Sequence, residues 1–471
     1  MIAQSLAGLV VFAGIAWLIS ENRTKVSLKI IITGILIQFA VGFILVKLPV
    51  FRKFFISLNQ LVLCLEESTT AGTSMVFGYL GGGPPPFVEK YPSASFILAF
   101  RTLPLILLIS ALSALLFYWK ILPMVVKAFS WALQKTMGLG GAEGLGVSAN
   151  IFIGMVESPL FIRPYLNEMS RSEIFTLMTS GMATIAGTVM VLYASILGNA
   201  IPDIMGHILT ASIISVPAAV MISKIMVPET GTPTSGELTS PEVSLSAMDA
   251  ITKGTMQGIQ LLINIIAMLI VLVALVHLVN IILSFLPEFG DQPVTLQRLL
   301  GLLMAPVVWL MGVPWEEAPV AGALMGTKTI LNEFLAYLDM SRLAPGALSQ
   351  KSLIIMTYAM CGFANPGSLG IMIGGMGTMA PERREEIVLL AFRSIVAGTL
   401  ATCMTGAGRR YSYGLTRKRK ETNLARVGFG SSQNKRSGSG KKKLYPVKTK
   451  LHQIDIRLLQ FFNFFPVQIK A

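Results

Sequence analysis

Charged residues are scarce in this chain of 471 residues, because only 13% of them are Asp, Glu, Lys or Arg, against about 25% in a soluble domain. Apolar residues make up 53% of the chain, and the mean hydropathy is +0.68. So little charge combined with so many apolar residues excludes an ordinary soluble domain. The composition predicts an integral membrane protein.

Cysteine and histidine are also rare, with three of each. Cys64, Cys361 and Cys403 form no CxxC pair and no Cys/His cluster, which excludes a disulfide framework and a structural zinc site. The chain has no P-loop, no GxSxG or HExxH motif and no Ser-Lys arrangement, which excludes an ATP-driven pump and an intramembrane protease. We therefore expect neither an enzyme nor an organic cofactor.

Positive charge is concentrated in one segment. The chain has 38 Lys and Arg against 24 Asp and Glu, a net charge of +14, and residues 409–450 hold 14 of the basic residues with a single acid, Glu421. The rest of the chain is almost neutral. A Gly-, Ser- and Lys-rich tail of this kind is typical of a disordered or lipid-contacting segment, so we do not expect nucleic-acid binding.

Eight apolar runs are long enough to cross a bilayer, which takes about 20 residues per helix. The first is expected to be a retained span, because it has no charged start and no small-residue cleavage site. The runs are residues 2–20, 28–46, 95–119, 174–198, 204–227, 258–286, 353–379 and 387–408. Two amphipathic stretches, 51–67 and 121–134, are typical of interfacial helices. Residues 228–242, rich in Pro, Gly, Thr and Ser, predict a solvated linker.

Two further apolar stretches, 138–165 and 299–338, are interrupted by small residues, Pro and carboxylates. The sequence GMVESP at 154–159 breaks the first, and GVPWEEAP at 312–319 breaks the second. A lipid-exposed helix would leave backbone groups unpaired at such breaks, which are tolerated only inside protein or beside water. The pattern therefore predicts two re-entrant hairpins.

Each hairpin is followed by a short polar segment and then by a long helix, which small residues interrupt at membrane depth. The sequence MTSGMATIAG at 178–187 interrupts the first helix, and GFANPGSLG at 362–370 forces unwinding of the second. Hairpin, broken helix and one more span form a repeat that is inverted in many secondary transporters. We expect an all-α membrane protein of about eight transmembrane helices plus two re-entrant hairpins. Its expected segments are 1–135 (N-terminal scaffold), 136–227 (first repeat), 228–298 (linker and long scaffold span), 299–408 (second repeat) and 409–471 (basic tail).

Two carboxylates within the hairpins are candidate functional residues, because charge inside a membrane is costly. Glu157 lies at the break of the first hairpin, and Glu333 lies late in the second. Two plainer alternatives are a surface loop around Glu157, and a pair between Glu333 and Lys328 on a solvated helix face. The matched positions of both carboxylates in an internal repeat favour function, because a broken helix follows each and exposes backbone groups to a ligand.

The stretch from GVPWEEAP to LNEFLAY at 312–337 closely resembles the concentrative nucleoside transporter family. So do GFAN at 362–365 and the segment from Asn150 to Tyr165, which matches the family's first hairpin. The resemblance runs to about residue 405. It implies a trimeric symporter of a cation and a nucleoside in the cytoplasmic membrane, with eight spans and two re-entrant hairpins and with the substrate between the hairpin tips and the unwound helices.

The resemblance also implies site residues. Glu333, Asn365 and Ser368 would hold the ribose hydroxyls, since carboxylate and amide oxygens accept from hydroxyl groups. The nucleobase would meet Gly154, Met155, Val156 and Glu157, with Val189 and Phe363 as apolar contacts. A coupling sodium ion would be bound by the side chains of Asn150 and Thr184 and by the backbone carbonyls of Ile153 and Ile185.

Departures from the family pattern leave part of this open. Met155 and Val156 stand where many members have Gln and a hydroxyl residue, so the choice between purine and pyrimidine stays open. Pro366 and Gly367 replace a bulkier apolar residue and Ser. Sodium is favoured as the coupling ion, because both side-chain oxygen ligands are present. The alternatives are proton coupling through Glu157 and an uncoupled facilitator or channel.

Overall fold

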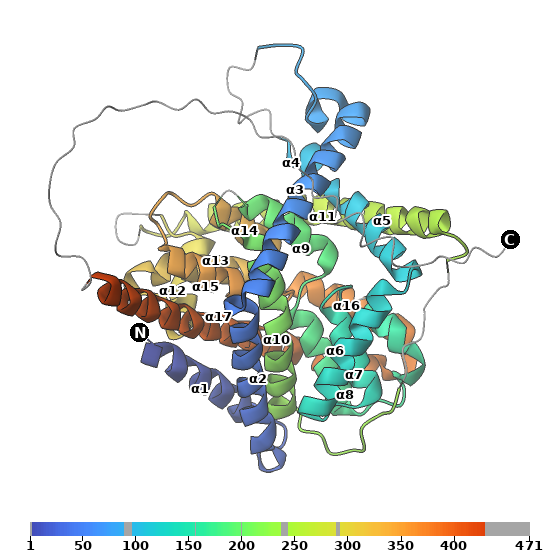
Figure 1. Ribbon diagram of the computed structural model, residues 1–471, viewed down its shortest axis with the longest axis vertical. Coiled ribbons are helices and arrows are strands. Elements are labelled where there is room, and N and C mark those ends of the chain that lie inside the picture. Colours follow the sequence, from blue (N-terminus) through green and yellow to red (C-terminus); the bar gives the residue numbers. More distant parts are fainter. Residues whose placement is uncertain are drawn as a thin grey trace. The chain divides into compact units, whose positions relative to one another are not determined.

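The computed structural model describes residues 2–88, 97–155, 157–198, 200–236, 244–288 and 293–428. The chain divides into two units, Met1–Lys418 and Arg419–Ala471, and the fold and the site described below belong to the first. Every regular element in the described residues is a helix (Figure 1). The predicted all-α class is therefore confirmed.

The N-terminal part of the chain supplies helices α1 to α6, which precede the segment expected as the first repeat. Gly138, with a φ of +70°, ends the last of them, as glycine commonly does in this left-handed conformation. Residues 51–67 and 121–134, expected as interfacial helices, form parts of α3 and α6; their place at a membrane surface stays a prediction. The helices are α1 (Ile2–Leu18), α2 (Leu28–Lys47), α3 (Pro49–Phe77), α4 (Leu98–Arg101), α5 (Leu105–Tyr118) and α6 (Ile121–Met137).

The first repeat has the predicted hairpin and the predicted broken helix. Ser170 caps α8 by accepting a hydrogen bond from the backbone N–H of Glu173, so the polar segment acts as a helix start. The helix then breaks at residues 184–186 and resumes as α9. The elements are α7 (Gly141–Asn150), η4 (Ser158–Tyr165), α8 (Arg171–Ala183), α9 (Gly187–Leu197) and α10 (Ile204–Met226).

The segment expected as the second repeat, 299–408, also contains helices joined at breaks, with one addition to the predicted pattern. The GVPWEEAP sequence forms the turn between α12 and α13, whereas the tip beside Glu333 is a separate break at Leu331 and Asn332. The interruption expected at 312–319 is therefore present, but it is a different break from the one that carries Glu333. The elements are α12 (Leu296–Leu310), η5 (Trp315–Glu317), α13 (Ala318–Ile330), α14 (Glu333–Ser341), α15 (Gln350–Ala359), α16 (Pro366–Met379), η6 (Pro381–Arg383) and α17 (Arg384–Gly428).

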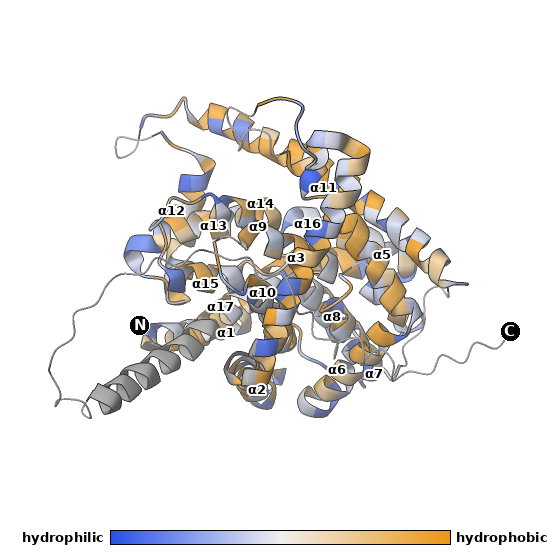
Figure 2. Ribbon diagram, turned by 45° about the horizontal axis from the view of Figure 1, so that its top comes forward, coloured by the Kyte–Doolittle hydropathy of each residue, from blue (hydrophilic) through white to orange (hydrophobic). Residues whose placement is uncertain are grey.

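Helix α11 (Ala247–Leu283) joins the repeats and packs along α5. Gly254 and Gly258 allow this close approach, because a Cβ at Gly254 would lie 2.6 Å from the Ser110 carbonyl oxygen. Hydrophobic residues run along both helices (Figure 2). In the most apolar stretch of α11, only 6% of the residues are buried inside the protein, whereas 89% are buried in the corresponding stretch of α10. Helix α10 is therefore central, and α11 presents an apolar face to its surroundings.

Six runs in the described residues are long and apolar enough to cross a membrane: Leu28–Leu45, Leu98–Tyr118, Arg171–Leu197, Ile204–Met226, Ala247–Leu283 and Pro381–Gly408. The first apolar helix is shorter, and the run at 353–379 is divided between α15 and α16. The count of eight spans stays a prediction.

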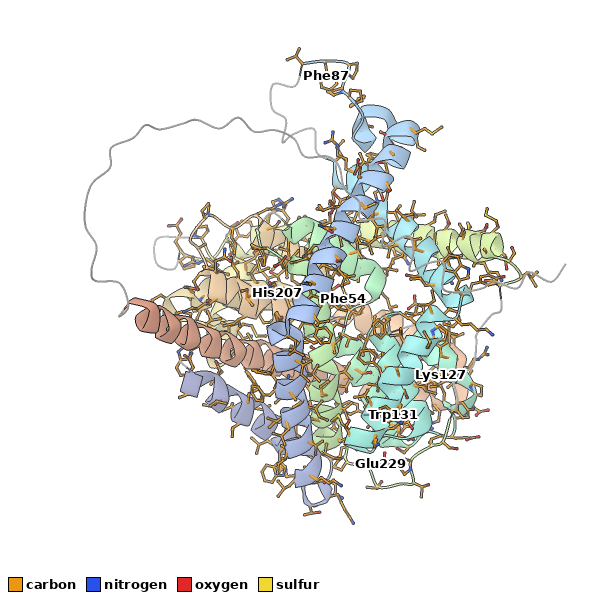
Figure 3. All side chains as sticks on the ribbon, in the orientation of Figure 1. Phe54, Phe87, Lys127, Trp131, His207 and Glu229 are labelled. Atoms are coloured by element: carbon orange, nitrogen blue, oxygen red, sulfur yellow. The ribbon has the colours of Figure 1, made fainter. Side chains whose placement is uncertain are left out.

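Figure 3 labels Phe54 on α3 and His207 on α10, two long helices that pack together.

The linker after α10 is exposed along most of its described length but is fastened to the first repeat. The Lys224 ammonium lies 2.8 Å from a Glu143 oxygen and 3.0 Å from a Glu229 oxygen, and Thr234 donates from its backbone N–H to Glu173 at 2.8 Å. Burial raises the pKa of the Glu229 carboxyl, but the Lys224 charge and the backbone N–H of Gly231 outweigh burial and hold it below its usual range. The linker is thus held against the base of the first hairpin by these ion pairs and this hydrogen bond.

The basic tail is helical at its start, because α17 continues to Gly428, where the sequence predicts disorder. Residues 409–428 therefore have a helical backbone, and the expectation of a disordered or lipid-contacting tail stays a prediction. The remainder of the expected tail, 429–471, lies outside the described residues.

Candidate functional site

A cavity of about 480 Å³ lies between the two hairpin tips, the two helix breaks and α11. Its volume is typical of a site for one small organic molecule. All the substrate-site candidates that the structure describes line this single cavity, and Val156 lies outside the described residues. The lining candidates are Gly154, Met155, Glu157, Val189, Glu333, Phe363, Asn365 and Ser368.

The first hairpin tip packs directly on the first helix break. Gly154 has a φ of +120°, and a Cβ there would lie 2.8 Å from a Glu157 carboxylate oxygen and 3.0 Å from the Ala186 Cβ. The backbone N–H of Gly187 donates to the Phe152 carbonyl at 2.9 Å. Glu157 thus lies at a tip that faces the cavity, rather than in a surface loop remote from it.

Gly187→Ala tests this contact between tip and break. The new Cβ would lie 2.6 Å from the Phe152 carbonyl oxygen, and overpacking of this kind costs about 1–3 kcal/mol. We expect the tip to be displaced and nucleoside uptake to fall by about tenfold or more. Gly374→Ala is the matched control, because a Cβ at this helical glycine meets nothing within 4 Å. Equal uptake by both variants would show that the contact is unimportant.

Glu333 begins α14 at the second tip and is 5% exposed. The Tyr193 hydroxyl donates to one carboxylate oxygen at 2.6 Å, and the Asn365 amide donates to the other at 3.0 Å. Lys328 is fully buried, and its ammonium has no hydrogen-bond partner among the described residues. The alternative of a solvated pair between Glu333 and Lys328 is therefore wrong.

Asn365 links Glu333 to the second helix break. Its side-chain oxygen caps α16 by accepting from the backbone N–H of Ser368 at 2.8 Å, which leaves its NH₂ group to face Glu333. The cap thus fixes which end of the amide points at the carboxylate. Ser368 is 9% exposed and lines the same cavity.

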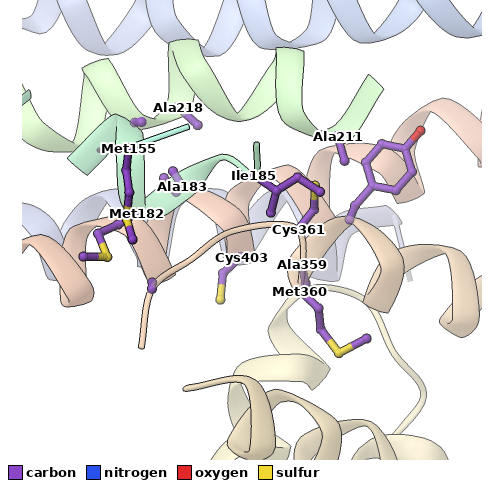
Figure 4. Close-up of a cluster of buried hydrophobic side chains, with 14 of the residues drawn as sticks. Met155, Met182, Ala183, Ile185, Ala211, Ala218, Ala359, Met360, Cys361 and Cys403 are labelled. Atoms are coloured by element: carbon purple, nitrogen blue, oxygen red, sulfur yellow. The ribbon is translucent and has the colours of Figure 1, made fainter. Parts of the chain in front are cut away.

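The two helix breaks lie against each other. A Cβ at Gly362, in the second break, would lie 2.8 Å from the Met182 carbonyl oxygen at the end of α8. Figure 4 shows Ala183, at the end of α8, and Ile185 of the first break in one apolar cluster with Met360 and Cys361 of the second. The cavity is therefore built on an apolar base that both repeats share.

Several lining residues escaped the sequence analysis. Tyr193 stands within an apolar run, and no local sequence pattern distinguishes it as a site residue. The amides of Gln257, Gln260 and Asn264 line the cavity from α11, and their i, i+3, i+7 spacing in an apolar helix could have marked a polar face.

Two of the four expected cation ligands, Asn150 and Thr184, lie beside each other at the end of α7 and the start of the first break. The Thr184 hydroxyl lies 3.3 Å from the Asn150 carbonyl oxygen and donates to the Ser180 carbonyl at 2.8 Å. The Asn150 side chain donates to the Ser180 hydroxyl at 2.8 Å and accepts from Ser158 at 2.9 Å. Ile153 and Ile185 lie in the adjoining tip and break. Buried neutral oxygens of this kind suit a hard alkali cation, and the described residues hold no cluster of His, Cys, Asp and Glu for another metal.

Comparison with known proteins agrees with this architecture. Family models match residues 7–80 (Na⁺ dependent nucleoside transporter N-terminus), 99–200 (nucleoside recognition) and 207–408 (Na⁺ dependent nucleoside transporter C-terminus). The transporter YutK of Bacillus subtilis is 37% identical over 407 residues, covering 85% of this chain and 97% of that protein. The chain belongs to the concentrative nucleoside transporter family.

Further relatives of this transporter agree with the assignment. The nucleoside permease NupC of Helicobacter pylori is 34% identical and covers 85% of this chain and 95% of its own. A solved structure of CNTnw in an inward-facing substrate-bound state has a TM-score of 0.80 and 33% identity, covering 87% of this chain and 98% of that one. The protein is thus a membrane transporter of the nucleoside-transporting family, and not an enzyme.

Proposed function

We propose that this transporter is a secondary-active importer that couples nucleoside uptake to a sodium gradient across the cytoplasmic membrane, and that it works as a homotrimer. The main support is the cavity between the tips, where a buried carboxylate and amide are held in place by hydrogen bonds. The match to a Na⁺ dependent family supports the choice of ion.

In this proposal, Glu333, Asn365 and Ser368 bind the ribose hydroxyls, because the carboxylate can accept from two vicinal hydroxyl donors. Val189 and Phe363 supply apolar contacts to the base.

Residues 154–157 of the first tip face the base. The side chains of Met155 and Val156 cannot make the hydrogen bonds of an amide or a hydroxyl. Base selection then falls to Glu157 and to the amides that α11 presents to the cavity.

Sodium would act through the first tip. Asn150 and Thr184 would bind it with side-chain oxygens, and Ile153 and Ile185 with carbonyls that lie in the tip and the break. A cation there would fix the tip against the break that precedes α9, the helix that carries Val189, and so would raise nucleoside affinity. Such coupling is reciprocal, because the nucleoside must raise sodium affinity by the same factor.

Calorimetric titration of uridine and adenosine into the purified trimer, in sodium and in choline salts, tests the proposal. We expect affinity to rise by about tenfold or more in sodium. Asn150→Ala should retain binding but lose most of this sodium effect, whereas Asn22→Ala, in an exposed loop, should behave as the wild type. Sodium-independent binding by the wild type would contradict the assigned coupling ion.

A further inference from the structure

Lys328 is a buried cation that the proposed mechanism does not use. It lies in the last turn of α13, its side chain is fully buried, and its ammonium has no hydrogen-bond partner among the described residues. An ammonium in such a place is costly unless a negative charge lies nearby. A neutral side chain of similar size would avoid that cost, so we expect the positive charge of Lys328 to have a function.

The internal repeat gives Lys328 a counterpart. Helix α7 packs on η4 and α8, and α13 packs on α14 and α15, so the two helices hold equivalent places in the two repeats. Asn150 ends α7 among the hydroxyls of Ser158, Ser180 and Thr184. Neutral oxygens thus lie at the end of α7 in the first repeat, whereas the Lys328 ammonium lies at the end of α13 in the second.

The surroundings of Lys328 supply one negative charge. The titratable groups that act on it are the Glu333 carboxylate and two thiols, Cys361 after α15 and Cys403 on α17. Both thiols are buried in the apolar cluster of Figure 4, so Glu333 is the one carboxylate among these groups. Glu333 lies five residues along the chain, across the break at Leu331 and Asn332.

We propose that Lys328 is a built-in cation of the second repeat, which takes the place that a bound sodium ion has in the first and keeps Glu333 ionised for nucleoside binding. The role assigned to Glu333 rests on the proposed function. Tyr193 and Asn365 orient the carboxylate through hydrogen bonds, and Lys328 balances its charge from within the protein. Lys328 is thus a positioning residue, since it acts on the substrate through Glu333.

Lys328→Met tests this role, because methionine is of similar length and uncharged. We expect Glu333 to take up a proton in this variant, so nucleoside affinity should fall by about tenfold or more between pH 8 and about pH 5.5, where carboxyl groups in apolar surroundings titrate. The wild type and the control Lys351→Met, at the partly exposed start of α15, should change by less than about threefold. Stimulation by sodium should persist in Lys328→Met, because the ion acts in the first repeat.

Other titratable groups face this pair and are common to all variants, so comparison with the wild type removes their contribution. They are Tyr193 on α9, Tyr337 on α14, Cys361, Cys403 and, across the cavity, Glu157. Infrared spectroscopy gives a readout that needs no nucleoside, because a protonated carboxyl has a carbonyl band that an ionised one lacks. We expect Lys328→Met to show an additional band of this kind over the wild type at neutral pH, and the double variant Lys328→Met/Glu333→Gln to lose that addition.

A double-mutant cycle separates a charge role from a packing role. If Lys328 acts through the Glu333 charge, Lys328→Met has no further effect on affinity in the Glu333→Gln background, and it raises the melting temperature there because it removes a buried ammonium that has lost its counter-charge. Effects that simply add, or an absent carboxyl band, overturn the proposal. If Lys328→Met does not fold, refolding by the added Glu333→Gln supports the charge pair, and failure of that rescue overturns it. A wild type that binds no nucleoside defeats the proposed function, while the infrared result still decides the role of Lys328.

Discussion

Replacing Glu333 by glutamine is expected to weaken nucleoside binding by at least about tenfold, since a hydrogen bond to a charged group contributes about 1.5–3 kcal/mol. The reason is geometric as well as electrostatic. Tyr193 and Asn365 each donate to one oxygen of Glu333, so a glutamine must turn its NH₂ group toward one of these donors. The pocket then loses both its negative charge and an orienting hydrogen bond.

Equilibrium binding of uridine and adenosine to purified Glu333→Gln measures this effect. Glu382→Gln, in the exposed 3₁₀ turn before α17, is the control and should bind as the wild type does. Both variants should be folded, as checked by their melting temperatures. Wild-type affinity in Glu333→Gln would remove Glu333 from the ribose site.

Asn365→Asp is expected to be as damaging as the loss of Glu333, even though the fold survives. Aspartate caps a helix about as well as asparagine, so the hydrogen bond from the Ser368 N–H is kept. The donor to Glu333 is lost, and two carboxylates then lie within hydrogen-bonding distance of each other. Nucleoside affinity should fall by about tenfold or more at neutral pH.

Two comparisons test this interpretation of Asn365. Acidification should partly restore binding in Asn365→Asp, because a proton shared by the two carboxylates removes their repulsion. Asn365→Ser keeps a helix cap without adding charge, and should bind more tightly than Asn365→Asp at neutral pH. The reverse order of affinities would mean that Asn365 acts as a cap alone.

The fold was predictable where the sequence carries helix-breaking residues in apolar surroundings. The Gly- and Pro-rich segment at 362–370 and the small residues at 184–187 mark breaks that the structure shows. The second tip was not found, because Leu331 and Asn332 include no Gly or Pro and the stronger signal at 312–319 belongs to a turn between α12 and α13. Asn332, which caps α14, was the available sequence signal.

The site shows the same limit. Glu333 and Asn365 were found because polar groups in apolar runs are costly and therefore informative. Tyr193 was missed, because its apolar ring hides a hydroxyl whose partner lies 140 positions away in the chain. The burial of Lys328 was missed as well, since a lysine beside a glutamate is more often an exposed ion pair. Such tertiary partners are fixed by packing between the repeats rather than by local sequence.

Uptake of radiolabelled uridine and adenosine into proteoliposomes, under an inward sodium gradient, an inward proton gradient or neither, tests sodium-coupled import most directly. The proposal predicts that only the sodium gradient drives nucleoside above its external concentration, and that Asn150→Ala loses this accumulation. Accumulation under the proton gradient alone would move coupling to Glu157, and equilibration without accumulation under every gradient would show a facilitator. Either result would contradict sodium-driven import.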